Sequence, residues 1–301
     1  MDTDIWRFLC ACTGSDEPQP LFCAAEAIAE VEAGRPNSLF AVHHRGQWYS
    51  YAATPDWTAV AVASVRDPSD SLWVVVGISA AGHVWELRPR TRVETSGQLP
   101  RETGMTNLGA VDQTVFACGM GRVVYRREPG GGSWTDISAP WPDASEGVVG
   151  FTAIAGRDAS LVYAVGWKGE IWALSEGRWR AEDSPTNANL NAVAVSDDGE
   201  VYCVGDDGVM LHGRNGMWTM IDTGTDVDLQ DVCMHGGEVF VASDFQVFRL
   251  EDGFLTLDLA GDGDSSLTCL KLRSGGRGGV LYSLGTHDVF QRTDEGWGRL
   301  A

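Results

Sequence analysis

Residues 151–185 read FTAIAGRDASLVYAVGWKGEIWALSEGRWRAEDSP, and residues 190–224 read LNAVAVSDDGEVYCVGDDGVMLHGRNGMWTMIDTG. The two stretches align almost without gaps. Each contains a short apolar run, then V-Y-x-V-G, a turn with Gly, a second apolar run, and G-x-W before a polar run. Runs of this length, rich in Val, Ile, Tyr and Trp and separated by Gly, Asp and Ser, are typical of β-strands joined by tight turns. The pair therefore predicts a repeated unit of four strands.

Similar units recur along the rest of the chain, and the most divergent one lies at the N-terminus. Seven units over 301 residues average about 43 residues each, which is the length of a four-stranded propeller blade. We predict an all-β fold, a single seven-bladed β-propeller domain with four-stranded antiparallel blades, rather than an open solenoid, because closure of the ring protects the strand edges. The expected blades span residues 1–55, 56–105, 106–149, 150–187, 188–227, 228–265 and 266–301.

One segment of the first blade departs from the strand pattern. Residues 24–33, AAEAIAEVEA, place Ala, Ile and Val at helical spacing and precede Gly34 and Pro36, which are typical helix terminators. We expect a short helical insertion of about two to three turns between the second and third strands of blade one.

The repeat pattern VYAVGWKGEIW…GRW…SPTNANLNAVAV…VYCVGDDGVML resembles the bacterial propellers grouped as YVTN/BNR-like repeats, which include the photosystem assembly-factor type. The resemblance covers residues 57–301, is best over 151–224, and implies the fold alone. Members of that group mostly look like protein-binding scaffolds, although sialidases share the architecture. The sialidase pattern S-x-D-x-G-x-x-W is absent from this sequence, so the resemblance leaves the activity open.

The composition favours a soluble, cytoplasmic protein. No apolar run approaches the roughly 20 residues that span a bilayer, and no basic segment precedes an apolar stretch at the N-terminus. The 7 Cys residues are odd in number and form no C-x-x-C pair, so we expect free thiols in a reducing compartment. We expect neither a membrane nor a nucleic acid as partner, because 22 Lys+Arg against 42 Asp+Glu give a formal charge of −20.

No motif for catalysis or metal binding stands out. Neither H-x-x-x-H nor H-E-x-x-H occurs, and the Cys residues lack zinc-ribbon spacing, so we expect no catalytic residue, no metal and no cofactor. The acidic runs at residues 222–228 and 261–266 lack the complete spacing and the distal Glu of a calcium loop. Ordinary acidic turns are favoured there, and a weak calcium site at either run stays open.

The acidic residues fall unevenly on the two faces of the expected propeller. Loops between the second and third strands of a blade, and loops between successive blades, lie on one face. By the repeat alignment that face receives twelve acidic residues against two clear bases, Arg101 and Lys168, whereas the opposite face is better balanced. Aromatic side chains surrounded by one sign of charge are typical of a binding hot spot with electrostatic steering. The expected partner-binding residues are Trp141, Trp167, Asp206, Asp207, Asp226, Asp228, Asp244, Phe245, Asp262, Asp264, His287 and Asp288.

Two functions remain open at this point, and acidic turns that only keep the protein soluble would give a similar charge. The first is a non-enzymatic scaffold, monomeric when free, that binds a basic protein partner; its sharpest form is an intracellular inhibitor or immunity protein against a toxin domain. The alternative is a propeller enzyme, a hydrolase or lyase acting on a sugar or small molecule at the mouth of the central channel. The enzyme requires convergent His, Glu and Arg side chains in the channel. The expected innermost strands are mainly apolar and small, with Asp231 and Lys271 as exceptions, which favours the scaffold.

Overall fold

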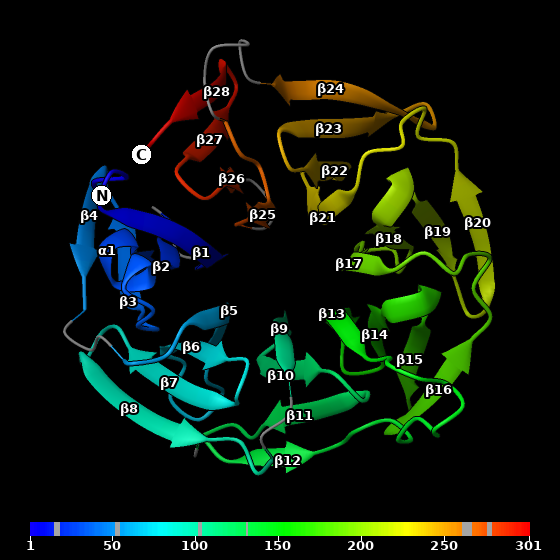
Figure 1. The fold of residues 1–301 in the computed structure, drawn as a ribbon, viewed down its shortest axis with the longest axis horizontal. Helices are drawn as coiled ribbons and strands as arrows, with labels where there is room; N and C mark the ends of the chain where they lie inside the picture. Colours follow the sequence, from blue (N-terminus) through cyan, green and yellow to red (C-terminus); the bar gives the residue numbers. More distant parts are fainter. Residues whose placement is uncertain (15–18, 52–54, 102–103, 131, 261–266, 276–278) are drawn as a thin grey trace.

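Seven four-stranded antiparallel sheets are arranged in a ring around a central axis in the computed structural model (Figure 1). The structure describes residues 1–301 except 15–18, 52–54, 102–103, 131, 261–266 and 276–278. Blades one to four comprise β1 (Trp6–Thr13), β2 (Leu21–Ala27), β3 (Leu39–His44), β4 (Gln47–Ser50), β5 (Ala59–Arg66), β6 (Trp73–Ser79), β7 (His83–Arg88), β8 (Val93–Gln98), β9 (Met105–Val111), β10 (Thr114–Gly119), β11 (Val123–Arg127), β12 (Trp134–Asp136), β13 (Phe151–Asp158), β14 (Leu161–Gly166), β15 (Ile171–Ser175) and β16 (Arg178–Glu182). Blades five to seven comprise β17 (Leu190–Val195), β18 (Val201–Gly205), β19 (Met210–Arg214), β20 (Met217–Ile221), β21 (Leu229–His235), β22 (Glu238–Ser243), β23 (Gln246–Glu251), β24 (Phe254–Ala260), β25 (Lys271–Ser274), β26 (Leu281–Leu284), β27 (Val289–Thr293) and β28 (Gly296–Arg299). The predicted all-β seven-bladed propeller is confirmed.

Each blade takes its four strands from one continuous segment of the chain, so the ring closes by contact between blades one and seven. Figure 1 shows the two termini side by side at this junction. The amide of Phe8 donates to the carbonyl of Thr286 at 2.8 Å, and the hydroxyl of Thr13 donates to the carbonyl of Ser274 at 2.8 Å. A cluster of buried side chains that includes Phe8 and Leu284 fills the space between the two sheets.

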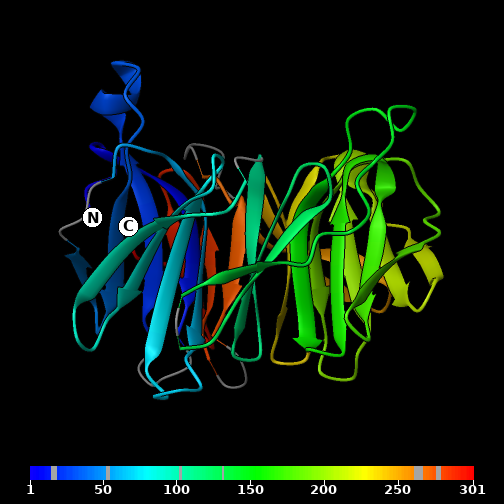
Figure 2. The ribbon, with the colours of Figure 1, turned by 90° about the horizontal axis from the view of Figure 1, so that it is seen from below.

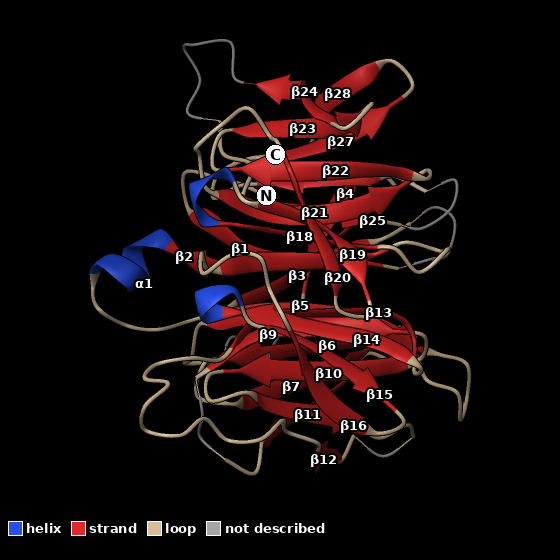
Figure 3. Ribbon diagram, turned by 90° about the vertical axis from the view of Figure 1, so that its right-hand side faces the viewer, coloured by secondary structure: helices blue, strands red, loops and turns tan. Residues whose placement is uncertain are grey.

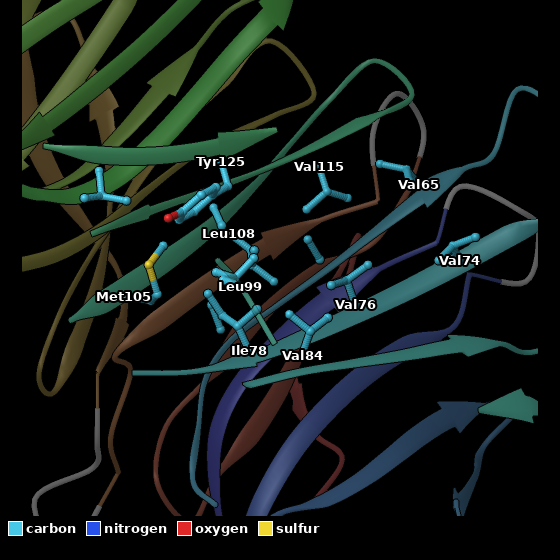
Figure 4. Close-up of a cluster of buried hydrophobic side chains, with 14 residues drawn as sticks. Val65, Val74, Val76, Ile78, Val84, Leu99, Met105, Leu108, Val115 and Tyr125 are labelled. Carbon is cyan, nitrogen blue, oxygen red and sulfur yellow. The ribbon is translucent and has the colours of Figure 1, made fainter. Parts of the chain in front are cut away.

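The core lies between neighbouring blades. The inner strands are buried on both faces and therefore read as nearly continuous apolar runs; β6, for example, is buried from Val74 to Ser79. Figure 4 shows the cluster between blades two and three, where Ile78 and Tyr125 are fully buried. Burying one Val or Leu side chain stabilises the fold by about 1.5–3 kcal/mol, so these clusters hold the blades together. The outermost strands are mostly exposed and polar, as β8 illustrates.

Polar side chains near the start of the innermost strands tie blades three, four and five each to the next one. The hydroxyl of Thr106 donates to the carbonyl of Phe151 at 2.7 Å, and the amide of Asn191 donates to the carbonyl of Leu229 at 3.1 Å. Thr152 makes the equivalent bond between blades four and five. These bonds explain why a Thr or Asn recurs at this place in otherwise apolar strands, since a buried polar group requires a partner.

The helix in blade one is shorter than the sequence indicates. Residues 24–27 extend β2, and α1 covers only Ile28–Glu32, so the expected two to three turns are not found. Ala24 and Ala25 are fully buried in β2 and pair with β1, and this tertiary pairing overrides their helical propensity. Helix α1 buries none of its residues and stands out from the ring (Figure 2). Within the described ranges, no helix has the length and apolar character that crossing a bilayer requires.

Two 3-10 turns, η1 (Trp167–Gly169) and η2 (Asp206–Gly208), connect the second and third strands of blades four and five. Figure 3 shows them on the same side of the ring as α1. We call this side the α1 face: it consists of α1, η1, η2, the other turns between second and third strands, and the connections between successive blades.

Candidate partner-binding face

The turns η1 and η2 share one backbone geometry. Their central residues, Lys168 and Asp207, both adopt the left-handed conformation, with φ of 56° in each case. The glycine that follows each of them lies against the backbone of the connection to the next blade: a Cβ on Gly208 would meet the Thr225 carbonyl oxygen at 2.0 Å, and Gly169 has the same arrangement. Only glycine allows this approach, so each turn is held rigidly on the next connection.

Two of the predicted acidic residues, Asp206 and Asp228, hold the turns of the scaffold in place. The carboxylate of Asp206 accepts hydrogen bonds from the side-chain amides of Asn189 and Asn191, each at 2.9 Å. The carboxylate of Asp228 accepts the backbone amide of Asp207 at 2.9 Å. Both carboxylates therefore position the turns.

The side chains of Asp207 and Asp226 project from the same region and are exposed. They belong to a group of acidic residues in blades four to six that form no ion pair with any residue the structure describes. This group, which we call the acidic arc, comprises Asp183, Asp206, Asp207, Asp222, Asp226, Asp228 and Asp244. Lys168 also lies here, and its ammonium donates to the backbone carbonyl of Glu146 at 2.6 Å. Its single positive charge is outnumbered by the seven carboxylates of the arc, which stays negative overall.

Exposed apolar side chains accompany the acidic arc. Trp141 is 63% exposed, Phe245 62% and Trp167 38%, and Val148 and Val227 are also exposed on this part of the α1 face. Large apolar side chains in solvent are informative when they gather on one surface. The structure thus brings the three predicted aromatic residues and the unpaired carboxylates onto one side of the ring.

The predicted residues of blade seven have a different environment. Asp288 is buried, and its carboxylate pairs with Arg299 at 2.7 Å and accepts the amide of Thr268 at 3.2 Å. His287 is half-buried, with Nδ1 at 3.3 Å from the carbonyl of Thr3. Asp288 therefore has a structural role inside blade seven, whereas His287 contacts the N-terminal segment at the junction with blade one. Asp262 and Asp264 lie outside the described residues.

Elsewhere on the α1 face, two acidic side chains of blade one have cationic partners. Glu26 pairs with Arg7, and Glu30 pairs with Arg35. Glu32, Asp56 and Asp143 form no ion pair with a described residue, so among the described residues of this face the acidic arc holds the larger share of the unpaired negative charge, but not all of it.

Sequence reasoning missed Arg122, the residue that holds the long connection between blades three and four. Arg122 is 5% exposed and pairs with Glu170 and Glu146. Its guanidinium also lies 5.0 Å from the centre of the Trp172 ring and 3.4 Å from the carbonyl of Pro140. Burial lowers the pKa of Arg122, but the hydrogen bonds to the two glutamates outweigh this effect and raise it. The signal was an Arg directly before the third strand, where blades four and seven carry the acidic residues Glu170 and Asp288.

The arginines of the opposite face are largely neutralised by nearby carboxylates. Arg88 pairs with Asp67 at 2.9 Å, and Arg127, which is buried, pairs with Glu86 at 2.9 Å. Burial raises the pKa of Asp67, but hydrogen bonds from Ser69 and its other partners outweigh this and lower the pKa to about 2. These charges stabilise the loops rather than face a partner.

The central channel contains a cavity of about 510 Å³ between the innermost strands. Its charged lining residues are Lys271 and the pair Asp231–Arg273, whose atoms are 2.7 Å apart. Neither His nor Glu occurs among the described residues that line it, so the set required by the enzyme alternative is not found there. Cys12 and Cys233 also line the cavity, and burial raises the pKa of each thiol to about 12.

All seven cysteines are free thiols. Among the residues the structure describes, no group of three or more His, Cys, Asp or Glu side chains is arranged to hold a metal ion.

Comparisons with known proteins relate the chain to others by fold and by sequence. No family model matches the chain. The solved structure of YCF48 bound to D1 peptide superposes with a TM-score of 0.57 at 13% identity, covering 75% of this chain and 77% of that chain, which shows the shared fold. Immune protein Tsi7 of Pseudomonas aeruginosa strain PAO1 is 33% identical over 251 residues, covering 81% of this chain and 80% of Tsi7. The chain therefore belongs to the family of the immune protein Tsi7.

Proposed function

We propose that this chain is a non-enzymatic immunity protein that neutralises a toxin by covering a basic surface of that toxin with the acidic, aromatic α1 face. The observation that carries the proposal is the 33% identity to a protein named as an immune protein over four fifths of the chain. The position of the acidic arc beside exposed aromatic residues supports the choice of face. A protein of the same fold, YCF48, was solved bound to D1 peptide, which supports a protein-binding use of such a ring.

The electrostatics favour rapid capture of a basic partner. A surface with one sign of charge raises association rates by about 10- to 1,000-fold when the partner carries the opposite sign. Trp167 and Phe245 would then supply the buried contacts that slow dissociation. The free thiols support action in a reducing compartment, which we take to be the cytoplasm, with the chain monomeric before it meets the toxin.

The function is tested by expressing each protein encoded next to the gene for this chain, alone and together with the chain. One of these proteins should arrest growth when it is expressed alone, and co-expression of this chain should restore growth. Growth arrest that persists when the chain is present at equal or higher level would refute the immunity role.

The choice of face is tested by matched charge reversals in a binding assay with the purified toxin. Asp207→Lys with Asp226→Lys should lower the association rate by about tenfold or more at low salt. Lys is compatible with the backbone at position 207, because Lys168 adopts the same left-handed conformation in the equivalent turn. The control, Asp294→Lys with Glu295→Lys, makes the same change in net charge in an exposed turn of the opposite face.

The difference between the two variants should shrink as the Debye length falls from about 10 Å at 0.1 M salt to about 3 Å at 1 M. Equal slowing by the control pair would mean that only total charge matters. Slowing by the control pair alone would assign binding to the opposite face.

A further inference from the structure

A pocket of about 590 Å³ opens on the α1 face between blade three and the connection to blade four. It is lined by the turn after β10, which includes Met120 and Gly121, and by the connection that carries Trp141, Asp143 and Val148. The proposed function needs only a charged face and does not by itself assign any role to this hollow.

The wall of the pocket is held in place although it is exposed. A Cβ on Gly121 would lie 2.6 Å from Cη2 of Trp141, so the indole ring lies directly on the backbone of the turn. The amide of Gly121 donates to the carbonyl of Val149 at 2.9 Å, which joins the turn to the connection. An indole fixed in this way loses little conformational freedom when a partner covers it, as an anchor residue requires.

The charge around the pocket leaves one carboxylate unpaired. Asp143 is the one charged residue among its described lining residues, and it forms no ion pair with any residue the structure describes. The Ser145 hydroxyl and amide donate to Asp143 and lower its pKa, so it stays ionised in mildly acidic solution. The nearby Glu146 carboxylate already pairs with Arg122, and Lys168 is held by the Glu146 carbonyl.

We infer that this pocket receives an arginine side chain of the protein partner. The guanidinium would lie on the Trp141 ring and pair with Asp143, while the aliphatic stem would pack against Met120 and Val148. A planar guanidinium combines stacking on an aromatic ring with forked hydrogen bonding to a carboxylate, whereas an apolar side chain would leave the carboxylate without a partner. The identity of the partner as a toxin rests on the proposed function, but the chemistry of the pocket does not.

The pocket is tested first without any partner. Fluorine NMR of the full chain labelled with 5-fluorotryptophan, with the Trp141 resonance assigned by Trp141→Phe, is recorded against N-acetyl-arginine amide at millimolar concentrations. The Trp141 resonance should shift in a saturable manner. N-acetyl-leucine amide should not shift it, and Asp143→Asn should abolish the shift produced by the arginine probe. A resonance unmoved by the arginine probe, or moved equally by the leucine probe, would overturn the inference.

The second measurement uses the purified toxin. Trp141→Ala and Asp143→Asn should each raise the Kd at least about tenfold. Phe254→Ala, which truncates an equally exposed aromatic residue on the outer strand β24, should leave it unchanged. Thermal unfolding of each variant checks that the fold is intact.

The two measurements separate the two proposals. Failure of the unmodified chain to bind the toxin refutes the proposed function, and the fluorine result still decides the pocket. Tight binding that neither Trp141→Ala nor Asp143→Asn weakens refutes the pocket as the anchor and leaves the immunity function intact.

Discussion

Replacing Arg122 by Met should show how much the connection between blades three and four depends on a single buried charge. Met keeps most of the side-chain length and apolar contact while removing the guanidinium. The change leaves Glu170 and Glu146 without their cation and removes the contact with the Trp172 ring. The two glutamates differ in environment, because the Glu146 side chain is 37% exposed and can be hydrated, whereas Glu170 is 12% exposed.

The expected loss in the free energy of unfolding follows from this difference in exposure. Removing one partner of a buried ion pair costs about 3–5 kcal/mol, and since only Glu170 is left in a buried site, we expect a value near the lower end. Loss of the contact between the guanidinium and the ring adds about 0.5–1 kcal/mol. The free energy of unfolding should therefore fall by about 3–4 kcal/mol, a large part of the 5–15 kcal/mol typical of a folded protein.

Urea unfolding followed by tryptophan fluorescence measures this loss. Adding Glu170→Gln to Arg122→Met removes the stranded carboxylate and should restore about 2 kcal/mol, so the two changes should be strongly non-additive. Arg126→Met, on the strand β11 that follows Arg122 and with its side chain 45% exposed, should cost less than about 1 kcal/mol. A loss below about 1 kcal/mol for Arg122→Met, or a double variant no more stable than the single one, would refute this account.

Two further changes test the loops of the two faces. Asp67→Asn should lower the free energy of unfolding by about 2 kcal/mol at pH 7, because the hydrogen bonds of Ser69 and the other partners hold the pKa of Asp67 at about 2 against 3.8 for the free side chain. That stability is present above about pH 4 and is lost as the pH falls toward 2, so urea titrations of the two proteins should converge in acid and a constant difference would contradict the assignment. Gly208→Ala should cost more than about 2 kcal/mol in thermal unfolding, since its Cβ would clash with Thr225, whereas Gly224→Ala, at a similar φ of +66° with open space around it, should cost about 1 kcal/mol. Equal losses for the two alanine variants would show that φ alone sets the cost.

The blades could be predicted because their signal is local. The inner strands carry their own apolar patterns, many turns carry a glycine, and the unit repeats seven times, so an error in one blade is corrected by the others. The predicted length of the helix was wrong because a contact outside the segment decides its structure. Ala24 and Ala25 have high helical propensity, and nothing nearby in the sequence shows that they pair with β1.

The site could be predicted only in part. The exposure of a side chain and its ion pairs depend on residues that the local sequence pattern does not show. The aromatic residues Trp141 and Phe245 lie in exposed loops, as the repeat alignment places them. The sequence does not show which carboxylates are already occupied. Asp288 meets Arg299 only when β27 and the C-terminal strand are assembled, and Arg122 reaches Glu170 across 48 positions of the chain.

The contact between blades one and seven also has a consequence for synthesis of the protein. Every sheet is made from one segment, so each blade can form its own hydrogen bonds soon after it leaves the ribosome. The bond between Thr13 and Ser274 spans 261 positions and cannot form until nearly the whole chain exists. Until then the apolar side of the first blade, including Phe8 and Leu21, has no neighbour to cover it. The nascent chain therefore exposes an aggregation-prone surface for most of its translation, and a chaperone that shields this first blade would protect it during that interval.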